Sequence, residues 1–198
     1  MMRIDDVKVL YGLACFSLCL IIVSPTIATF VSFPSGEPFS EIWVLGSGHM
    51  LEGYPFDVEN GAKEQVFVGV GNHLGRSAYY VVYVKLRNQT QALPNSTISE
   101  PSPLAPLYEF RAVVADGETW EEPFAFSFLE ASHFGDLFAV KKISINDQVF
   151  TVEYPCVWDS ENNGFFYQLF FELWIYDDDS SSFRYHNRFA GIWLNMTV

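Results

Sequence analysis

Residues 64–86 read EQVFVGVGNHLGRSAYYVVYVKL and contain the two clearest strand patterns of this 198-residue chain. Valine occupies every second position at the start, which predicts an extended strand over 64–72 with the valines on one face. The stretch 77–86 is rich in Tyr and Val, residues that favour strands. Residues 72–76, NHLGR, have the composition of a turn. We therefore predict that the two strands form an antiparallel hairpin.

Further strand candidates lie on both sides of this stretch. They are rich in aromatic and β-branched residues and are separated by turn residues: 41–48, 108–115, 121–128, 138–145, 148–154, 165–177 and 189–198. Seven to nine short strands predict an all-β fold, an Ig-like antiparallel β-sandwich. We expect 41–48 and 64–72 to share a sheet that faces 165–177. A short helix over 129–136 is a weaker alternative for that segment.

A long uncharged run precedes the strands. No residue from Val9 to Phe33 is charged, and about 20 apolar residues are enough to cross a bilayer. We therefore predict a cytoplasmic N-terminus (1–8), a transmembrane signal-anchor helix (9–33) in contact with membrane lipid, and an extracytoplasmic β-sandwich domain (34–198).

The charges beside this run set its orientation. Arg3 and Lys8 precede it and Glu37 follows it, so the positive-inside rule keeps the N-terminus in the cytoplasm. The alternative is a cleaved signal peptide, with small residues near a cleavage site at Thr26-Ile27-Ala28. Both interpretations place the domain outside the cytoplasm, at the cell membrane.

Charge and cysteine content exclude several classes of function. The formal net charge of -13 repels nucleic acid, so no nucleic-acid partner is expected. Cys15 and Cys19 lie in the hydrophobic run, which leaves Cys156 alone in the domain. A disulfide within the domain is therefore impossible, and no spacing of zinc ligands occurs. We expect Cys156 to be a small buried hydrophobe.

The segment 87–107, RNQTQALPNSTISEPSPLAPL, is rich in Pro, Ser, Thr and Asn and predicts a mobile exposed loop. It contains two sequons, at Asn88 and Asn95, and a third lies at Asn195. In an exported domain these are candidate sites for attached glycans. Because Asn195 falls in a predicted strand, we expect it to be the least accessible of the three.

No motif of catalysis or of cofactor binding stands out. Gly69 and Gly71 begin a dinucleotide fingerprint that lacks its third glycine and its helix. The run 177–179, DDD, offers oxygen ligands for calcium, but a solvated hairpin tip explains it better. Glu153 and Glu172 are candidates for an acid and base, but solvent-facing strand positions explain them better. We therefore expect no enzyme, no cofactor and no metal site.

Aromatic residues supply the candidates for contact with other molecules. Trp43, Trp174 and Trp193 lie in predicted strands, where packing explains them. Trp120 and Trp158 lie nearer loops and are the exposed candidates. The loop around Tyr54-Pro55 and the loop 87–107 are further interaction candidates.

Several motifs resemble the extracellular part of an archaeal family of uncharacterised membrane proteins, domain of unknown function 1616. They are Phe39-Ser40-Glu41-Ile42-Trp43-Val44-Leu45-Gly46, Tyr54-Pro55, Gly61, Val66-Phe67-Val68-Gly69-Val70-Gly71-Asn72-His73, Phe170-Phe171-Glu172-Leu173-Trp174-Ile175-Tyr176, Arg184-Tyr185 and Ile192-Trp193-Leu194-Asn195. The resemblance covers most of 39–90 and 165–198 and implies a membrane-tethered, Ig-like outer domain. Longer members of the family carry several membrane helices, whereas this chain has one candidate.

These observations lead to three hypotheses. The first is a noncatalytic membrane-anchored surface protein or accessory subunit, whose β-sandwich contacts a protein of a cell-envelope or membrane complex. It requires an exposed sheet edge or apolar patch. The alternative is a glycan- or ligand-binding extracytoplasmic module, with Trp120 or Trp158 exposed beside polar side chains. A hydrolase with a site assembled from distant residues is the third.

Overall fold

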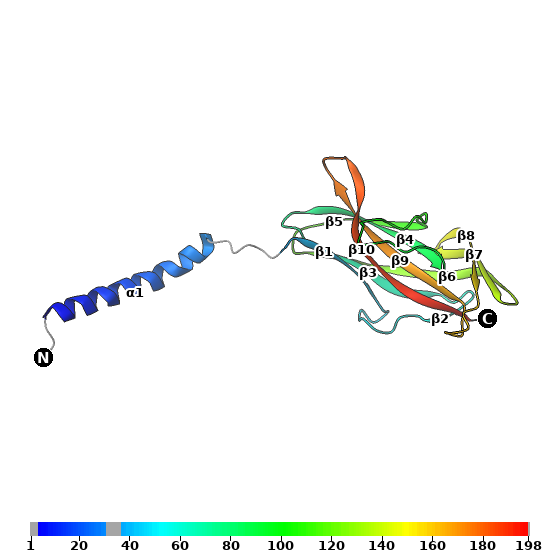
Figure 1. Ribbon diagram of the computed structural model, residues 1–198, viewed down its shortest axis with the longest axis horizontal. Coiled ribbons are helices and arrows are strands. Elements are labelled where there is room, and N and C mark those ends of the chain that lie inside the picture. Colours follow the sequence, from blue (N-terminus) through cyan, green and yellow to red (C-terminus); the bar gives the residue numbers. More distant parts are fainter. Residues whose placement is uncertain (1–3, 31–36, 198) are drawn as a thin grey trace. The chain divides into compact units, whose positions relative to one another are not determined.

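The computed structural model describes residues 4–30 and 37–197, and within the N-terminal helix it describes the side chains of residues 8, 9 and 11–22. The chain forms two compact units, Met1–Pro38 and Phe39–Val198. The first unit holds one helix and the second holds the β strands (Figure 1).

The helix α1 spans Ile4–Phe30. All of its described side chains are exposed, including large hydrophobic ones such as Tyr11, Phe16 and Ile21. Among the residues whose side chains are described, no helix is long and apolar enough to cross a membrane, in contrast to the span predicted over 9–33. Residues 31–33 of that predicted span lie outside the described part of the chain.

The second unit is a sandwich of two five-stranded sheets (Figure 1). The first sheet has the order β1-β3-β6-β7-β8, with β1 at Phe39–Leu45, β3 at Glu64–His73, β6 at Thr119–Phe134, β7 at Leu137–Ile145 and β8 at Gln148–Val157. The second has the order β2-β10-β9-β4-β5, with β2 at Asp57–Glu59, β10 at Ser182–Thr197, β9 at Phe166–Asp177, β4 at Ala78–Asn88 and β5 at Tyr108–Val114. The predicted mostly-β sandwich is therefore confirmed.

The core lies between the sheets and follows the alternation of the sequence. Alternate residues of the strands point into this core because successive side chains of a strand point to opposite faces; in β4 and β9 many outward-facing residues are buried as well. The fully buried side chains include Val66, Val68, Val70, Phe124, Phe126, Phe128, Tyr167, Leu169 and Phe171. As predicted, β1 pairs with β3, and the strand over 166–177 belongs to the facing sheet.

The predicted hairpin over 64–86 is wrong. The strand β3 pairs with β1 and β6, whereas β4 pairs with β5 and β9 in the other sheet. The turn between them therefore crosses from one sheet to the other. Buried Asn72 holds this crossing, since its Nδ2 donates to the carbonyls of Arg76 (2.8 Å) and Val114 (2.9 Å) while its Oδ1 accepts from Tyr80 Oη (3.0 Å).

Two strands are longer than predicted. No helix forms over 129–136, because β6 continues to Phe134 and pairs with β7 in one register. The pairing skips Glu130, whose φ is +53°. The strand β10 begins at Ser182 and contains a bulge between Tyr185 and Arg188. The tip of the β9–β10 hairpin projects from the domain, and the described part of the chain has ten strands where seven to nine were expected (Figure 1).

Candidate functional site

A groove lies between β1, the loop that follows it, and β10; we call it the YP groove. Its walls are β1 residues 42–44, the loop side chains Leu51, Tyr54, Pro55 and Phe56, and β10 residues 190–193, around a volume of about 610 Å³. The predicted interaction residues Tyr54 and Pro55 both line it. Apolar side chains dominate these walls, and Leu51 is 75% exposed.

The loop of the YP groove is held in place by hydrogen bonds to backbone carbonyls. Tyr54 Oη donates to the carbonyl of Val44 (2.8 Å), and Gly46 N donates to the carbonyl of Met50 (2.8 Å). A side chain at Gly46 would overlap the carbonyl oxygen of Glu52. The glycine therefore lets the loop return close to β1 and present its apolar residues.

A second pocket adjoins the groove and shares Phe56 and Trp193 with it. This Arg87 pocket has a volume of about 550 Å³ and is lined by Phe56, Arg87, Gln89, Asp159, Asn162, Phe166 and Trp193. In register, Arg87 and Trp193 both pair with Gln168, so the three lie in a row across β4, β9 and β10. Alternation places this row on the outer face of its sheet, since Leu86 and Leu194 are buried in the core.

Arg87 is the cation of this pocket. Its side chain is only 6% exposed, its Cζ lies 5.2 Å from the centroid of the Trp193 ring, and burial lowers its pKa. Nε donates to the carbonyl of Asn88 (2.8 Å) and one Nη to that of Gln89 (2.9 Å). Among the described residues no carboxylate forms an ion pair with it.

Asp159 supplies the negative charge of the same pocket. Its carboxylate accepts hydrogen bonds from Asn162 Nδ2 (2.8 Å) and from the backbone N–H groups of Asn162 (3.1 Å) and Glu161 (3.0 Å). These bonds lower its pKa, because they stabilise the charged form. The pocket therefore presents a cation, an anion and three aromatic rings.

Trp158 and Trp120, the predicted exposed aromatics, differ in their surroundings. Trp158 is 42% exposed and lines a separate hollow of about 460 Å³. Trp120 is half-buried and packs against the ring of Phe110, with centroids 5.4 Å apart. Trp193 was expected to pack in the core but is 41% exposed. A strict alternation from Ile192 to Met196 places it outward.

Glu172, expected to face solvent, is completely buried. It forms an ion pair with Lys85 (Oε2–Nζ 2.8 Å), and Trp174 Nε1 donates to the same oxygen (3.1 Å). The loop 87–107, predicted to be exposed, covers this pair: Ser102 N donates to Glu172 Oε1 (2.8 Å), and Lys85 Nζ donates to the carbonyl of Ser102 (2.9 Å). Every charged atom of the pair thus has a partner. No contact joins Glu172 to exposed Glu153 in the described residues.

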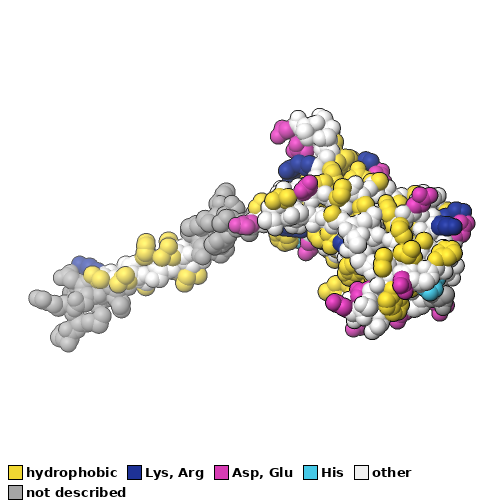
Figure 2. Space-filling view, turned by 45° about the vertical axis from the view of Figure 1, so that its right-hand side comes forward, with side chains coloured by type: hydrophobic (Ala, Val, Ile, Leu, Met, Phe, Trp, Pro, Cys, Tyr) yellow, Lys and Arg dark blue, Asp and Glu magenta, His cyan; other side chains and the backbone are white. Residues whose placement is uncertain are grey.

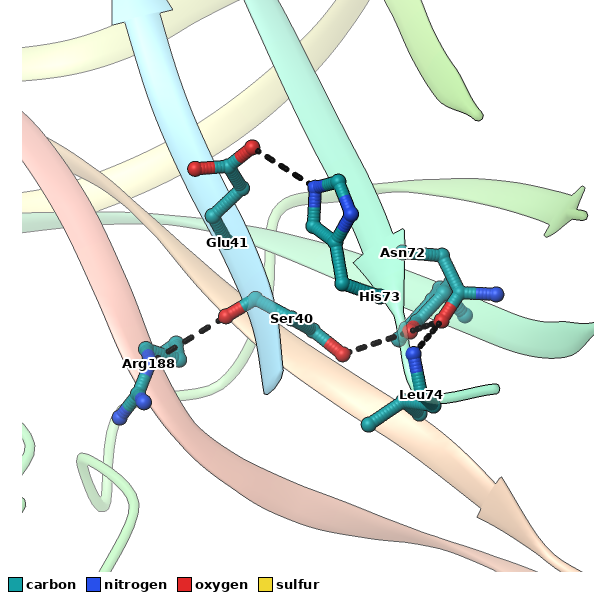
Figure 3. A network of polar contacts seen from close by, with 7 residues as sticks. Ser40, Glu41, Asn72, His73, Leu74 and Arg188 are labelled. Atoms are coloured by element: carbon teal, nitrogen blue, oxygen red, sulfur yellow. Dashed lines mark hydrogen bonds and ion pairs between the residues drawn. The ribbon is translucent and has the colours of Figure 1, made fainter. Parts of the chain in front are cut away.

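A polar network joins the two sheets at the start of β1 (Figure 3). Ser40 Oγ lies 2.6 Å from Tyr80 Oη and 3.0 Å from His186 Nε2, while Arg188 Nε donates to its carbonyl (3.3 Å). A serine beside a histidine is the arrangement of an activated nucleophile. However, Ser40 is 1% exposed, so a substrate cannot reach it, and the network serves to hold β1 against β10.

Cys156 is buried, as expected. Its Sγ lies 2.9 Å from Gln89 Oε1, to which it donates, and burial raises its pKa to about 11. The thiol is therefore protonated and unreactive at neutral pH. Within the described part of the chain, no group of three or more His, Cys, Asp or Glu side chains is placed to hold a metal ion.

The asparagine side-chain amides of the three sequons differ in their hydrogen bonds. Asn88 Nδ2 donates to the carbonyl of Pro155 (2.8 Å), and Asn195 Nδ2 donates to Asp57 Oδ1 (2.8 Å). Asn95 is exposed, and its Oδ1 accepts from Thr97 N (3.0 Å). A glycan is attached at Nδ2, so it would disturb the Nδ2 hydrogen bonds of Asn88 and Asn195, whereas Asn95 shows only a bond to its Oδ1. Asn95 is therefore the most suitable of the three acceptors.

Acidic side chains are dispersed over the domain. On the face shown in Figure 2 they are scattered, singly or in small groups, and do not form one large acidic patch. The negative charge is therefore a general property of that surface, which favours solubility.

Comparisons with known proteins concern the family and the fold. The sequence matches the family model described as "Domain of unknown function (DUF1616)" over residues 34–133, and no curated protein matches it. A CARDB domain from Pyrococcus furiosus, solved in complex with di-metal ions, is 9% identical with a TM-score of 0.42, covering 84% of this chain and 94% of that one.

Two further solved structures are similar at the same low level. A β-glucosidase from Listeria innocua, solved with gluconolactone, is 11% identical (TM-score 0.43); the match covers 81% of this chain and 16% of the enzyme. A chain from the human seminal-plasma complex of Zinc 2-glycoprotein and Prolactin inducible protein is 8% identical (TM-score 0.38), with coverages of 83% and 100%. None of these similarities assigns a function.

Proposed function

This chain belongs to the DUF1616 family, as its motifs predicted, and we propose that it is a noncatalytic surface module that contacts a protein of a cell-envelope or membrane complex. The observation that carries this proposal is the YP groove, where Leu51 (75% exposed) stands beside Tyr54, Phe56 and Trp193. Contiguous exposed apolar side chains are uncommon on monomeric soluble domains and mark interaction sites. Tyr, Trp and Phe are enriched where interfaces bind most strongly.

Attachment to a membrane is the second part of the proposal. The uncharged run from Val9 to Phe33, with Arg3 and Lys8 before it, supports a single-pass anchor with a cytoplasmic N-terminus and an extracytoplasmic domain. A C-terminal tag on the full chain tests this placement. We expect it to stay with membranes through alkaline carbonate washing and to be digested by protease added to intact cells; a tag protected in intact cells would contradict the orientation.

Retrieval of the full chain from gently solubilised native membranes tests the contact. We expect one companion protein at about equal amounts, identified by mass spectrometry. Leu51→Asp places a charge in the groove, where desolvation is unfavourable, and should reduce the companion at least about tenfold, or 1.4 kcal/mol. The matched control is Val113→Asp on β5, since Val113 is 72% exposed and lies outside the groove. Equal recovery with both variants would contradict the proposed surface.

The Arg87 pocket is the feature that favours the alternative function, a glycan- or ligand-binding module. This function requires an exposed tryptophan beside polar side chains, and we expected Trp120 or Trp158 in that role. In the pocket the tryptophan is Trp193, which lies beside Arg87, Asp159 and Asn162.

A further inference from the structure

We propose that the Arg87 pocket binds a sugar residue that carries one carboxylate, such as a hexuronic acid. This inference rests on the alternative function and is tested separately from the protein contact at the YP groove, although the two sites share Phe56 and Trp193. It rests on the charge, the walls and the rim of the pocket.

The positive charge of Arg87 favours an anionic ligand in the pocket. A buried cation is unfavourable unless a negative group and hydrogen-bond acceptors compensate it. Arg87 has only two backbone carbonyls as acceptors among the described residues, and a guanidinium has five N–H groups. Three N–H groups are left on its two terminal nitrogens, and a guanidinium can bind a carboxylate with two parallel hydrogen bonds.

The walls of the pocket suit a ring. Phe56, Phe166 and Trp193 surround a space of about 550 Å³, which lies within the roughly 300–1,000 Å³ of small-molecule sites. A pyranose has C–H groups on its faces, which pack on aromatic rings, and hydroxyls around its edge. A small anion such as acetate would leave these aromatic walls uncovered.

The polar side chains of the rim suit hydroxyl groups. The carboxylate of Asp159, whose pKa is lowered, accepts hydrogen bonds from hydroxyls and repels a second negative charge. The net charge of -13 also opposes densely anionic ligands. Together these charges select a ligand with one carboxylate and several neutral hydroxyls.

Gln168 lies next to this pocket in the sheet but does not line it. It pairs in register with both Arg87 and Trp193, it is 7% exposed, and its Oε1 has no hydrogen-bond partner among the described residues. An enclosed polar atom without a partner is uncommon in folded proteins.

A peptide C-terminus is the other source of a single carboxylate. Peptide capture uses backbone N–H and C=O groups of the receptor. Here the nearby carbonyls of Asn88 and Gln89 are already bonded to Arg87, and side chains line the pocket. The sugar is therefore the better fit.

Calorimetric titration of the full chain in detergent tests the inference with three probes: D-glucuronate, D-glucose and N-acetylglycine. We expect glucuronate to bind with a Kd of about 1 mM and glucose at least about tenfold more weakly. N-Acetylglycine, which mimics a peptide C-terminus, should also bind at least about tenfold more weakly. Arg87→Lys keeps the charge but loses the planar fork, so it should weaken glucuronate binding several-fold.

Two tryptophans of equal exposure provide a matched pair of variants. Trp193→Ala should abolish glucuronate binding, whereas Trp158→Ala, in the separate hollow, should leave it unchanged; the two side chains are 41% and 42% exposed. Thermal unfolding of each variant verifies that it is folded. Leu51→Asp should lose the protein companion and keep glucuronate binding, which separates the two proposals.

Four outcomes would overturn the inference. They are no saturable binding at about ten times the expected Kd, equal affinity for glucose, equal losses in the two tryptophan variants, and affinity for N-acetylglycine as high as for glucuronate. The last would assign the pocket to a peptide carboxylate.

Discussion

Lys85 and Arg87 are two buried cations on the same face of β4, two residues apart, but the groups that compensate their charges differ. Lys85 pairs with buried Glu172 and lies beneath Ser102 of the loop 87–107. Arg87 bonds only to backbone carbonyls and lines an open pocket beside Trp193. Burial of a charge therefore does not indicate function by itself; the groups that compensate the charge distinguish a structural pair from a candidate binding site.

The largest effect is expected at the Lys85–Glu172 pair. Glu172→Leu leaves the ammonium of Lys85 buried without its partner, which should lower the free energy of unfolding by about 3–5 kcal/mol. The double variant Lys85→Met/Glu172→Leu removes both charges and should recover most of that loss. Chemical denaturation of the three proteins measures this. A double variant as unstable as the single one would mean that the pair is not the source of the stability.

A smaller effect is expected at Arg87. Arg87→Met removes a cation without leaving a buried carboxylate behind, although two carbonyls lose a donor. We expect a loss of about 1–2 kcal/mol in the same denaturation experiment. A loss equal to that of Glu172→Leu would remove the contrast between the two cations and assign Arg87 a structural role.

Trp174, beside the Lys85–Glu172 pair, and Trp193, beside Arg87, allow the same comparison of the two cation sites. Trp174→Phe removes the indole donor to Glu172 Oε2 (3.1 Å) and should cost about 1 kcal/mol. Trp193→Phe removes no hydrogen bond shown among the described residues and should cost less than about 0.5 kcal/mol. Thermal unfolding by circular dichroism compares them, and the reverse order would contradict the structural role of the covered pair.

The last effect appears only at alkaline pH and concerns Cys156, which donates to Gln89 at the side of the Arg87 pocket. Burial raises its pKa from 9.0 to about 11, so the unfolded chain releases this proton at lower pH than the folded chain does. Stability should therefore fall as pH rises from about 9 to 11. Cys156→Ala should flatten this part of the unfolding free energy measured against pH; an unchanged slope would exclude the thiol as its cause.

The strands were predictable from sequence because alternation reports which residues share a face. Alternation does not report which sheet a strand joins. The turn over 72–76 has the composition of a hairpin, yet Asn72 bonds across to Val114 and Tyr80 and directs the chain into the other sheet. That choice depends on partners such as Phe171 and Phe124, distant in sequence, that no local pattern contains.

The candidate site was predicted only in part, for a related reason. Tyr54 and Pro55 were found from a loop motif, and both line the YP groove. Arg87 and Trp193 were missed, although their alternation with Leu86 and Leu194 places them outward. Glu172 also points outward from its sheet, but outward does not mean exposed where a loop such as 87–107 covers the sheet.

The pairing of β2 with β10 also bears on how fast the domain folds. Asn195 and Asp57 are joined across 138 positions of the chain, and β4 meets β9 with Tyr80 beside Ile175. Distant strands must come together, with the loss of loop entropy, before their contacts stabilise the fold. Local hairpins such as β9–β10 do not replace these distant pairings, so refolding is expected on the slow millisecond-to-second scale of sandwich proteins.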